Sequence, residues 1–544
     1  MLGTGAATNS FDDIECARTI LVVGSNATEN HPIVGARIRQ AARRGANLIV
    51  IDPRRIELAE EADCHLAPQP GTNPLLLNAM AAAIVEEGLV DEEFVQRRVA
   101  EFDLFRTFIA SYRPETVATQ CGVPAGEIRR AARLYATARP AFSAHGLGLT
   151  EHVQGTEGVM CLVNLALLTG NLGRPGSGIN PLRGQNNVQG SAQMGCMPES
   201  LTGGAALGPH RERFEAVWGT PLPLTSGLDL LQMMDAASGG RFKALWAIGY
   251  DVLMTNADMH ATRAAFRRME CVVVQDLFLN ETAREFGTVF LPAASSFEKE
   301  GTFMNAERRI QRVRKVLAPP GEARSDWEIL CDIAGAMGGG DLFAFQSPEE
   351  IWNEIRQVWP AVGGMTYERL DRQGLQWPCP TEGHPGTSTL HVDAFPSGDR
   401  AALRRVEYRP SAEAITPEYP LRLMTGRNLY HFNAGTMTGR TANILLWPAD
   451  MLEMRPDDAA RLEITDGDLV TVESRSGVAC LPARLTDELR PGEVFCTFHD
   501  PRGAVNAVVG PGRDFWTHTP EYKVTAVRIR RAPDGGDPPP ASPR

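Results

Sequence analysis

The sequence predicts a multidomain α/β protein that ends in a β-barrel. Two stretches, residues 18–52 and 243–276, each have the pattern of a strand, a turn, a helix and a second strand. From residue 421 onward the chain consists of short alternating runs separated by turn residues, which is typical of a barrel. The 544 residues allow about three or four domains at roughly 150 residues each.

The bulk composition excludes several classes of protein. The net charge of −12 argues against a nucleic-acid or anionic-membrane partner, which favours a basic surface. The opening residues MLGTGAATNSFDDIE lack the basic and apolar regions of a signal peptide, and apolar runs such as CLVNLALLTG (161–170) are too short to cross a bilayer. We therefore expect a cytoplasmic protein with no membrane insertion and no nucleic-acid partner.

The potential metal ligands are scattered along the chain. The ten cysteines include no C-x-x-C pair and the histidines include no H-x-x-x-H pair, although iron–sulfur and zinc sites need clustered ligands. We therefore predict no protein ligand to a metal, and reduced thiols throughout. Five loop histidines are expected to act as hydrogen-bonding residues: His31, His145, His152, His431 and His499.

Breaker residues define the first strand–helix–strand unit. An apolar, β-branched run ends at Gly24, Pro32 opens a helical stretch that Gly45 closes, and a second buried strand (48–52) ends in Asp52. Such a unit predicts a parallel sheet with helices on both faces. Ligands bind at the carboxyl edge of these sheets, where Gly24 and Asp52 are both expected to lie.

The second unit repeats this arrangement. Its first strand ends at Gly249, a helix is expected over residues 257–269, and the strand CVVVQD ends in Asp276. The glycine and the acid are 28 positions apart in the first unit and 27 in the second. An acid at a strand end suits a ribose diol, so the matched pair favours two similar ligands. Neither unit contains G-x-G-x-x-G, which weakens the case for an NAD site, and each acid taken alone could simply cap a strand end.

The other segments are predicted from apolar spacing and punctuation. Residues 75–139 have the i, i+3, i+4 spacing of helices, 143–158 is a glycine-rich loop, and 159–173 is a buried helix ending at Gly170. Proline and charged residues punctuate 395–420, which suits a linker. Four strand runs follow residue 421: LRLMTGR, LVTVESRSG, VACLPARLTD and EVFCTFH.

Five polar loops share an unusual composition, rich in Gly, Asn, Thr, Arg and His and poor in acids. They are residues 24–32, 68–73, 183–190, 426–440 and 499–506. Together they favour one large, polar, anionic ligand at a domain interface, although ordinary turn chemistry explains any one of them. In PLRGQNNVQG (181–190) an arginine stands beside four side-chain amides, with no acid to compete for it.

Several longer motifs indicate a family. GSNATENHPIVGARI (24–38), LTGNLGRPGSGINPLRGQNNVQG (168–190) and EKEGTFMNAERRIQR (298–312) resemble the catalytic (alpha) subunit of molybdenum- or tungsten-dependent formate dehydrogenases, in the dimethyl-sulfoxide-reductase (molybdopterin oxidoreductase) superfamily. The resemblance extends from GTGAATNS to Ile529. It implies two Rossmann-like dinucleotide-binding α/β domains followed by a double-psi-like β-barrel. The implied segments are 1–185 and 186–345 for the two guanine dinucleotides, 346–415 as a connection, 416–531 as the barrel that closes over the pterins, and 532–544 as a disordered tail.

The resemblance implies a two-electron oxidation of formate to carbon dioxide on bis-molybdopterin guanine dinucleotide carrying molybdenum or tungsten. Arg183 is the implied catalytic residue, which orients formate beside the metal, with Gln185 and Asn186 nearby as cofactor contacts. A guanidinium matches a small carboxylate and stays charged. The implied contacts of one nucleotide are Asn26, Asp52, Arg54, Gly71 and Asn73; those of the other are Gly249, Asp251, Gln275, Asp276 and Asp326; those of the pterins are Arg427, His431, Asn506, Tyr522 and Lys523.

The chain departs from the family at its start. The family has a four-cysteine iron–sulfur domain, then a metal-ligating cysteine or selenocysteine followed by histidine, just before the segment that resembles GTGAATNS. Because Arg183 and the nucleotide loops look intact, we expect a truncated gene product or one half of a split subunit; a cofactor-binding remnant without redox activity is the alternative. Iron–sulfur clusters are then expected only on the missing segment or on partner subunits, and the chain alone is expected to be inactive.

The resemblance also implies partner proteins. They are iron–sulfur and flavin/NAD-binding subunits of an NAD-linked complex and, for a split subunit, a separate N-terminal half. Gln193 stands where many relatives have aspartate, so another substrate within the superfamily, such as nitrate, stays open. A non-catalytic cofactor-binding or assembly subunit is the third interpretation.

Overall fold

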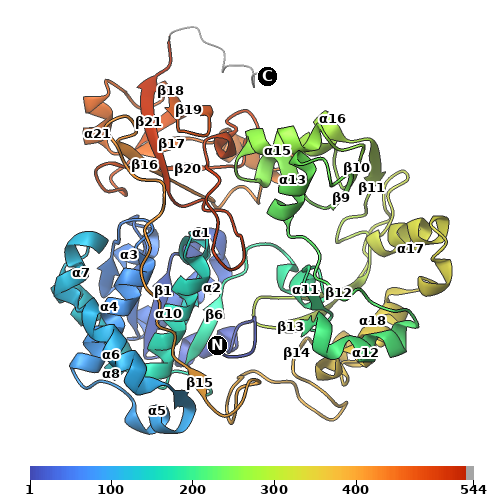
Figure 1. Cartoon of the computed structure of the whole chain (residues 1–544), viewed down its shortest axis with the longest axis horizontal. Helices are drawn as coiled ribbons and strands as arrows, with labels where there is room; N and C mark the ends of the chain where they lie inside the picture. The colour runs from blue at the N-terminus through green and yellow to red at the C-terminus, as the bar shows by residue number, and fades with distance from the viewer. Residues whose placement is uncertain (534–544) are drawn as a thin grey trace. The chain divides into compact units, whose positions relative to one another are not determined.

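The computed structural model describes residues 1–533 (Figure 1). Its contacts divide the chain into two compact units. The first unit comprises Met1–Leu182, Leu253–Thr262 and the chain from Thr389 onward; the second comprises Arg183–Val252 and Arg263–Ser388. Most of the predicted tail, 534–544, lies outside the described residues, and the domain bounds given above stay a prediction. No helix within residues 1–533 is both long and apolar enough to span a membrane.

A five-stranded parallel sheet forms the centre of the first unit, as the first βαβ pattern predicts (Figure 1). Alternate side chains of its strands enter two different cores: Leu21 and Val23 join one, and Ile20 and Val22 join the other. This alternation places helices on both faces. The strand order is β3 (Cys64–Leu66), β2 (Asn47–Ile51), β1 (Thr19–Val23), β5 (Ala141–His145) and β6 (Gly178–Pro181).

The helices of the first unit divide between these two cores. Apolar residues of α4 (Asn73–Glu86), α8 (Ala125–Thr137) and α10 (Gly155–Leu168) pack in one core, and those of α2 (Pro32–Arg43) in the other. Helix α10 starts four residues before the end of the predicted loop 143–158, so that boundary was wrong. The remaining helices are α1 (Ala27–Asn30), α3 (Glu57–Glu60), α5 (Glu92–Arg98), α6 (Phe102–Ile109), α7 (Pro114–Cys121) and α9 (Leu147–Thr150).

The first unit also contains a closed barrel, as predicted. Its strands run in the order β16 (Leu421–Gly426), β20 (Glu493–Thr497), β17 (Leu452–Met454), β19 (Val478–Leu485), β18 (Leu469–Glu473) and β21 (Thr525–Arg531). Strand β21 pairs with both β16 and β18, so the last strand closes the barrel. Short helices α20 (Asn443–Leu446) and α21 (Pro456–Arg461) lie in its connections.

The second unit contains a smaller parallel sheet, which confirms the second βαβ pattern. Its strands are β9 (Ala244–Ile248), β10 (Cys271–Asp276) and β11 (Val289–Pro292), with β10 in the middle. The predicted helix over 257–269 is α15 (Met259–Phe266), preceded by α14 (Val252–Thr255). Residues Leu253–Thr262, which include most of α14 and the first half of α15, belong to the first unit, and the rest of α15 belongs to the second unit. Its other helices are α11 (Val188–Gln193), α12 (Leu207–Trp218), α13 (Leu230–Ser238), α16 (Glu281–Phe286), α17 (Asp326–Ala336), α18 (Pro348–Val358) and α19 (Tyr367–Arg372).

Short strands and 3-10 turns complete the two units. An antiparallel sheet of β12 (Gly301–Met304), β13 (Arg309–Val313) and β14 (Leu375–Gln376) lies in the second unit. The two-stranded sheets are β7 (Ser200–Leu201) with β8 (Ala205–Ala206), and β4 (Val99–Ala100) with β15 (Ala401–Ala402). The 3-10 turns are η1 (Phe11–Cys16), η2 (Ala110–Tyr112), η3 (Gly340–Leu342), η4 (Pro360–Val362), η5 (Thr438–Arg440) and η6 (Val505–Ala507).

Part of the predicted linker is a fixed strap, residues 403–409. The buried side chain of Asn164 donates to the Arg404 carbonyl at 2.8 Å and accepts from its N–H at 3.0 Å. Ten residues before Asn164, Gln154 donates to the carbonyl of Glu407 at 2.8 Å and accepts from the N–H of Arg409 at 2.7 Å. The two side-chain amides bond the backbone N–H and carbonyl groups that a neighbouring strand would otherwise bond. Local sequence cannot reveal these long-range contacts.

Candidate functional site

Two glycine loops meet at the carboxyl edge of the sheet in the first unit. Gly24 has a left-handed backbone (φ 55°), and a side chain there would lie only 2.4 Å from the carbonyl carbon of Gly148. The N–H of Gly148 donates to the Gly24 carbonyl at 2.9 Å. Gly24 follows β1 and Gly148 follows β5, its neighbour, so only glycine allows the two backbones to approach this closely.

Asp52 and Arg54 lie at the next strand end and contact the barrel of the same unit. Asp52 is buried and accepts from the N–H of Arg54 at 3.0 Å; burial raises the pKa of its carboxyl, and the charge of Arg54 opposes this rise. The Arg54 guanidinium lies over the ring of Phe495, 3.7 Å from its centroid, and 3.7 Å from a Glu453 oxygen. Arg54 at the sheet edge therefore contacts two barrel strands, β20 through Phe495 and β17 through Glu453.

Further predicted residues gather around this edge. Asn26 accepts from the Thr28 hydroxyl at 3.1 Å, and Asn73 donates to the Gly148 carbonyl at 3.0 Å. Gly71 has a left-handed backbone (φ 91°), and a side chain there would lie 3.5 Å from Val524, next to the predicted Lys523. Five residues predicted for one nucleotide and the barrel segment 522–524 thus belong to one unit.

The barrel residues are fixed by contacts inside the first unit. Lys523 donates to the Thr425 carbonyl at 2.7 Å and pairs with Glu151 at 2.7 Å. The Tyr522 hydroxyl donates to the Thr255 carbonyl at 2.7 Å, and the Asn506 amide donates to the Met254 carbonyl at 2.8 Å. Helix α14 therefore joins the barrel, a contact for which the sequence gave no signal.

Two histidines hold the loop that follows β16. His431 contacts the Trp447 carbonyl through Nε2 at 2.7 Å and the Thr438 hydroxyl through Nδ1 at 3.1 Å, so both ring nitrogens are engaged inside this loop. His499 contacts the Asn433 carbonyl through Nδ1 and accepts from the N–H of Asn428 at 3.4 Å. Burial lowers the pKa of His499 to about 4. The expected hydrogen-bonding role of both histidines is confirmed.

Arg427 lies at the start of this loop, directly after β16. It is half-buried, and burial lowers the pKa of its guanidinium while Glu151 opposes that change. Its Nε atom is buried and has no hydrogen-bond partner among residues 1–533.

In the second unit, two of the three predicted aspartates, Asp251 and Asp276, accept hydrogen bonds from backbone N–H groups. Gly249 has a left-handed backbone (φ 61°), and its N–H donates to the Gln275 carbonyl at 2.7 Å. Asp251 accepts from the N–H of Glu281 at 3.1 Å and from Thr282, at the start of α16. Asp276 accepts from the N–H of Leu277 at 2.6 Å and from the amide of Asn280 at 2.8 Å.

A polar cluster lies at the end of β10. The Gln275 amide donates to Asp326 Oδ1 at 2.8 Å, and Lys299 forms an ion pair with Asp326 Oδ2. Gln275 is fully buried, and its Oε1 has no partner among the described residues. Lys299 belongs to the EKEGTF motif but was absent from the predicted set.

The loop PLRGQNNVQG carries Arg183 into the second unit. Arg183 is half-buried, and burial lowers the pKa of its guanidinium, which still remains charged near neutral pH. Gln185 is also half-buried, whereas Asn186 is exposed. Asn187 adopts a left-handed backbone (φ 58°) and accepts from the N–H of Met304 in β12 at 2.9 Å, which ties the loop to the EKEGTF motif.

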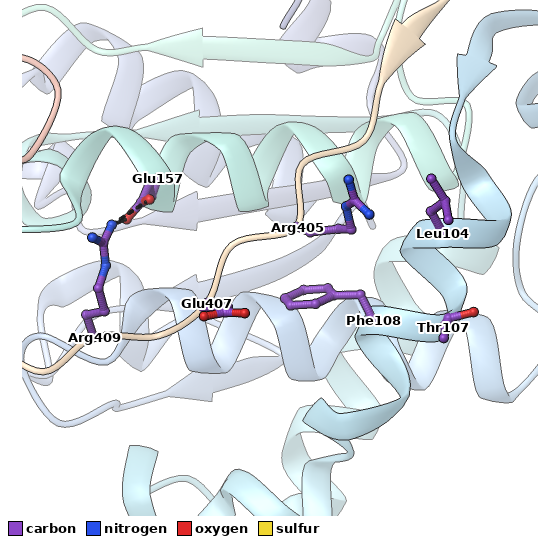
Figure 2. Close-up of a pocket in the computed structure, with 7 residues that line it drawn as sticks. All are labelled: Leu104, Thr107, Phe108, Glu157, Arg405, Glu407 and Arg409. Carbon is purple, nitrogen blue, oxygen red and sulfur yellow. Dashed lines mark hydrogen bonds and ion pairs between the residues drawn. The ribbon is translucent and has the colours of Figure 1, made fainter.

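An open cavity of about 670 Å³ lies elsewhere in the first unit, on its helical side (Figure 2). Figure 2 shows Glu407 of the strap beside Phe108 of α6, and Arg409 paired with Glu157 of α10 at 2.8 Å. None of the predicted site residues lines this cavity. Within residues 1–533, no three His, Cys, Asp or Glu side chains are grouped as metal ligands would be.

Two family matches cover most of the chain. Residues 3–336 match the molybdopterin oxidoreductase family, and residues 421–526 match the molybdopterin dinucleotide binding domain. The chain belongs to the molybdopterin oxidoreductase family. These matches support a molybdopterin dinucleotide as the cofactor of this molybdopterin oxidoreductase.

Curated relatives extend over nearly the whole chain. The F420-dependent formate dehydrogenase subunit alpha of Methanocaldococcus jannaschii is 42% identical over 97% of the chain and 79% of its own length. Formate dehydrogenase H of Escherichia coli is 38% identical over 98% of the chain and 75% of its own length. The assimilatory nitrate reductase catalytic subunit of Bacillus subtilis is 34% identical over 96% of the chain and 75% of its own length.

A solved structure has the same fold. Acetylene hydratase from Pelobacter acetylenicus superposes with a TM-score of 0.77 over 98% of this chain and 80% of its own, at 21% identity. The mixed α/β architecture with a closed barrel is therefore the fold of this molybdopterin oxidoreductase.

Unpaired buried atoms test whether the predicted loops fit such a cofactor. Folded proteins rarely leave buried polar atoms without hydrogen bonds, so clustered exceptions indicate a missing polar ligand. In the described part of the chain, several of these exceptions fall on or next to the predicted loops, while others, such as Arg39 Nε, Arg98 Nε and Thr525 Oγ1, lie elsewhere. The former include Ser25 Oγ, His152 Nδ1, Thr255 Oγ1, Arg427 Nε, Asn428 Nδ2 and Asn506 Oδ1 in the first unit, and the Gln189 amide and Gln275 Oε1 in the second. A ligand as rich in donors and acceptors as a molybdopterin dinucleotide fits them.

Proposed function

We propose that this molybdopterin oxidoreductase is a formate dehydrogenase catalytic subunit, which oxidises formate to carbon dioxide and releases one proton and two electrons. The observation that carries the proposal is Arg183, a half-buried guanidinium in a loop of neutral amides without an acid. Such a group binds a small carboxylate through two parallel hydrogen bonds. The names of the M. jannaschii and E. coli relatives support formate as that carboxylate.

The role of Arg183 is to bind and orient the substrate. Its charge offsets that of formate, and its planar fork fixes the carboxylate so that the C–H bond has one direction. Gln185 and Asn186 offer uncharged hydrogen bonds to the cofactor. When bound, the cofactor would supply a molybdenum or tungsten acceptor for the two electrons, while Arg183 would hold and orient the formate.

The cofactor we propose is bis-molybdopterin guanine dinucleotide. Each parallel sheet acts as a Rossmann-like nucleotide site: Asn26, Asp52, Arg54, Gly71 and Asn73 serve one nucleotide, and Gly249, Asp251, Gln275, Asp276 and Asp326 serve the other. The unpaired Oε1 of Gln275 supports the second nucleotide assignment, and the unpaired Oδ1 of Asn506 supports the proposed pterin contacts. Because both ring nitrogens of His431 are engaged in its own loop, its contact with a pterin would use the ring face or edge.

The electrons leave through partner proteins. Formate dehydrogenase relatives carry the words subunit alpha in their names, which supports a multisubunit complex for this chain. We propose iron–sulfur and flavin/NAD-binding partners and a cytoplasmic location.

A substrate panel tests the function. The complex purified from its native host is assayed for formate-dependent reduction of an artificial electron acceptor and, with a reduced dye, for nitrate reduction. We expect formate turnover. Nitrate is the second candidate because the B. subtilis nitrate reductase is 34% identical. Nitrate turnover without formate turnover would exclude the proposed function.

A further inference from the structure

One glutamine in the Arg183 loop is fully buried without any hydrogen bond from its amide. Gln189 lies in α11, and neither its Nε2 nor its Oε1 has a partner among residues 1–533. Another buried glutamine of the same unit, Gln376, is satisfied at both ends: it donates to the Glu307 carbonyl at 2.8 Å and accepts from Arg309 at 3.3 Å. Gln189 is therefore an exception within its own unit.

The backbone around Gln189 is held in place on both sides. Asn187 accepts from the N–H of Met304 at 2.9 Å, and a side chain at Gly190 would lie 2.1 Å from the same Asn187 oxygen. The N–H of Ser191 donates to the Asn187 carbonyl at 2.9 Å. Gln189 itself is fully buried. Burial of an unpaired amide opposes folding unless a ligand completes its hydrogen bonds.

The position of this amide indicates what the ligand is. Gln189 is in the same loop as Arg183, and Gln275, also fully buried with an unpaired Oε1, is a proposed nucleotide contact in the same unit. A glutamine amide presents one donor and one acceptor side by side without charge. That pattern complements the edge of a heterocycle on which an N–H and a carbonyl are adjacent, rather than a small anion.

We propose that Gln189 is a cofactor-binding residue that pairs with the amino-oxopyrimidine edge of the molybdopterin dinucleotide. This edge is present both in the pterin and in guanine, so the shared chemistry is the recognised feature. The proposal rests on the proposed function for the identity of the cofactor. It explains why the motif RGQNNVQG carries a second glutamine, Gln189.

The test replaces Gln189 by a residue of similar shape without polar atoms, Gln189→Met. In cofactor-free protein from a host that cannot make molybdopterin, the melting temperature should rise, because an unpaired amide has been removed. In the loaded enzyme, cofactor should be released roughly 5- to 150-fold faster, which corresponds to the loss of two hydrogen bonds. Released pterin is measured by fluorescence after oxidation, and released metal by mass spectrometry.

The matched control is Gln376→Met, in which a satisfied buried amide is removed. Here the melting temperature should fall and the rate of cofactor release should stay near that of the wild type. Gln189→Glu is a second variant that keeps an acceptor and loses the donor. Its rate of cofactor release should therefore lie between those of the wild type and Gln189→Met. Wild-type retention of cofactor in either soluble Gln189 variant would overturn the proposal.

Binding of GDP to cofactor-free protein shows whether Gln189 pairs with the guanine or with the pterin. Weaker GDP binding by Gln189→Met assigns the residue to guanine, whereas unchanged GDP binding with faster cofactor release assigns it to the pterin. Because the readout is retention of cofactor, a wild-type enzyme that holds the cofactor but does not oxidise formate contradicts the proposed function alone.

Discussion

Asp52 and Asp276 occupy matching positions in the sequence but differ in their chemistry. Asp52 is buried at the end of β2, and burial raises the pKa of its carboxyl. Asp276 is half-buried at the end of β10, and the Leu277 N–H and the Asn280 amide contact both of its oxygens. Asp52 therefore has more capacity left for a ribose diol, while Asp276 also performs the capping role that was the alternative for each acid.

Substitution of Arg183 should lower formate turnover without removing the cofactor. Loss of a charged hydrogen bond to a bound carboxylate costs on the order of 2–5 kcal/mol, or roughly 30-fold to several thousand-fold in kcat/KM. Arg183→Ala should lose more than Arg183→Lys, which keeps the charge but not the planar fork. The measurement is formate oxidation per bound metal; an unchanged per-metal rate with less cofactor would mean that Arg183 only supports the loop.

His499 should make the stability of the first unit depend on pH. Its folded pKa of about 4 lies below its ordinary value of 6.5, so the unfolded chain takes up the proton first. Stability is therefore full above about pH 6.5 and falls as the pH drops toward 4, by up to about 3 kcal/mol. Urea unfolding at several pH values should show a shallower acid-side loss for His499→Gln.

An exposed histidine provides the control for this pH dependence. His210→Gln, in the exposed part of α12, should leave the slope of the wild type unchanged. Equal slopes for the wild type and His499→Gln would show that this ring does not govern the acid sensitivity.

At the scale of elements, side-chain amides replace a missing strand along the strap 403–409. Asn164 and Gln154 project from α10 and its N-terminal boundary and pair with the backbone of the strap. Asn78 of α4 adds a bond to the Val406 carbonyl at 2.9 Å. The chain between β15 and the barrel is thereby held on the helical face of the first unit.

Asn164→Ala should loosen this strap. It leaves the N–H and carbonyl of Arg404 without their partner, which costs about 2–4 kcal/mol if water does not replace the amide. Chemical denaturation measures the loss, and trypsin should cut faster after Arg404 and Arg405. The exposed Asn353→Ala in α18 is the control and should change neither quantity. Wild-type protease resistance in Asn164→Ala would show that the strap is held by other contacts.

At the scale of the whole molecule, two parallel sheets lie in two separate units, each with a left-handed glycine after its first strand. The repeat suggests that the chain binds two related nucleotides rather than one. The barrel belongs to the first unit, where Arg54 contacts Phe495 and Glu453.

The loaded enzyme should therefore release two guanine nucleotides for each metal. Mild acid hydrolysis followed by chromatography gives the amount of GMP, and metal analysis gives the reference. A ratio of one, or release of a cytosine nucleotide, would contradict a bis-guanine cofactor. The Asp276→Asn variant should lower the cofactor content per chain less than Asp52→Asn, because Asp52 combines burial with unused acceptor capacity.

Much of the fold could be predicted because it depends on neighbouring residues. Gly24, Pro32 and Gly45 delimit β1, α2 and β2 correctly, since backbone restrictions act within a few positions. Strand β17, of three residues, has too little pattern to be recognised, and the start of α10 was hidden by the glycines 155 and 158. The strap was predicted as a linker because its partner amides lie about 240 residues away.

The sequence by itself determined the family, the α/β and barrel architecture, and the loop that carries Arg183. These properties depend on residue types and local spacing. Only the tertiary structure decided which polar atoms are left without partners. That Gln189 is unpaired while Gln376 is satisfied, and that His431 is engaged within its own loop, depends on which distant groups arrive beside each side chain. A buried polar atom without a hydrogen bond costs free energy. Such atoms therefore indicate where a polar ligand binds.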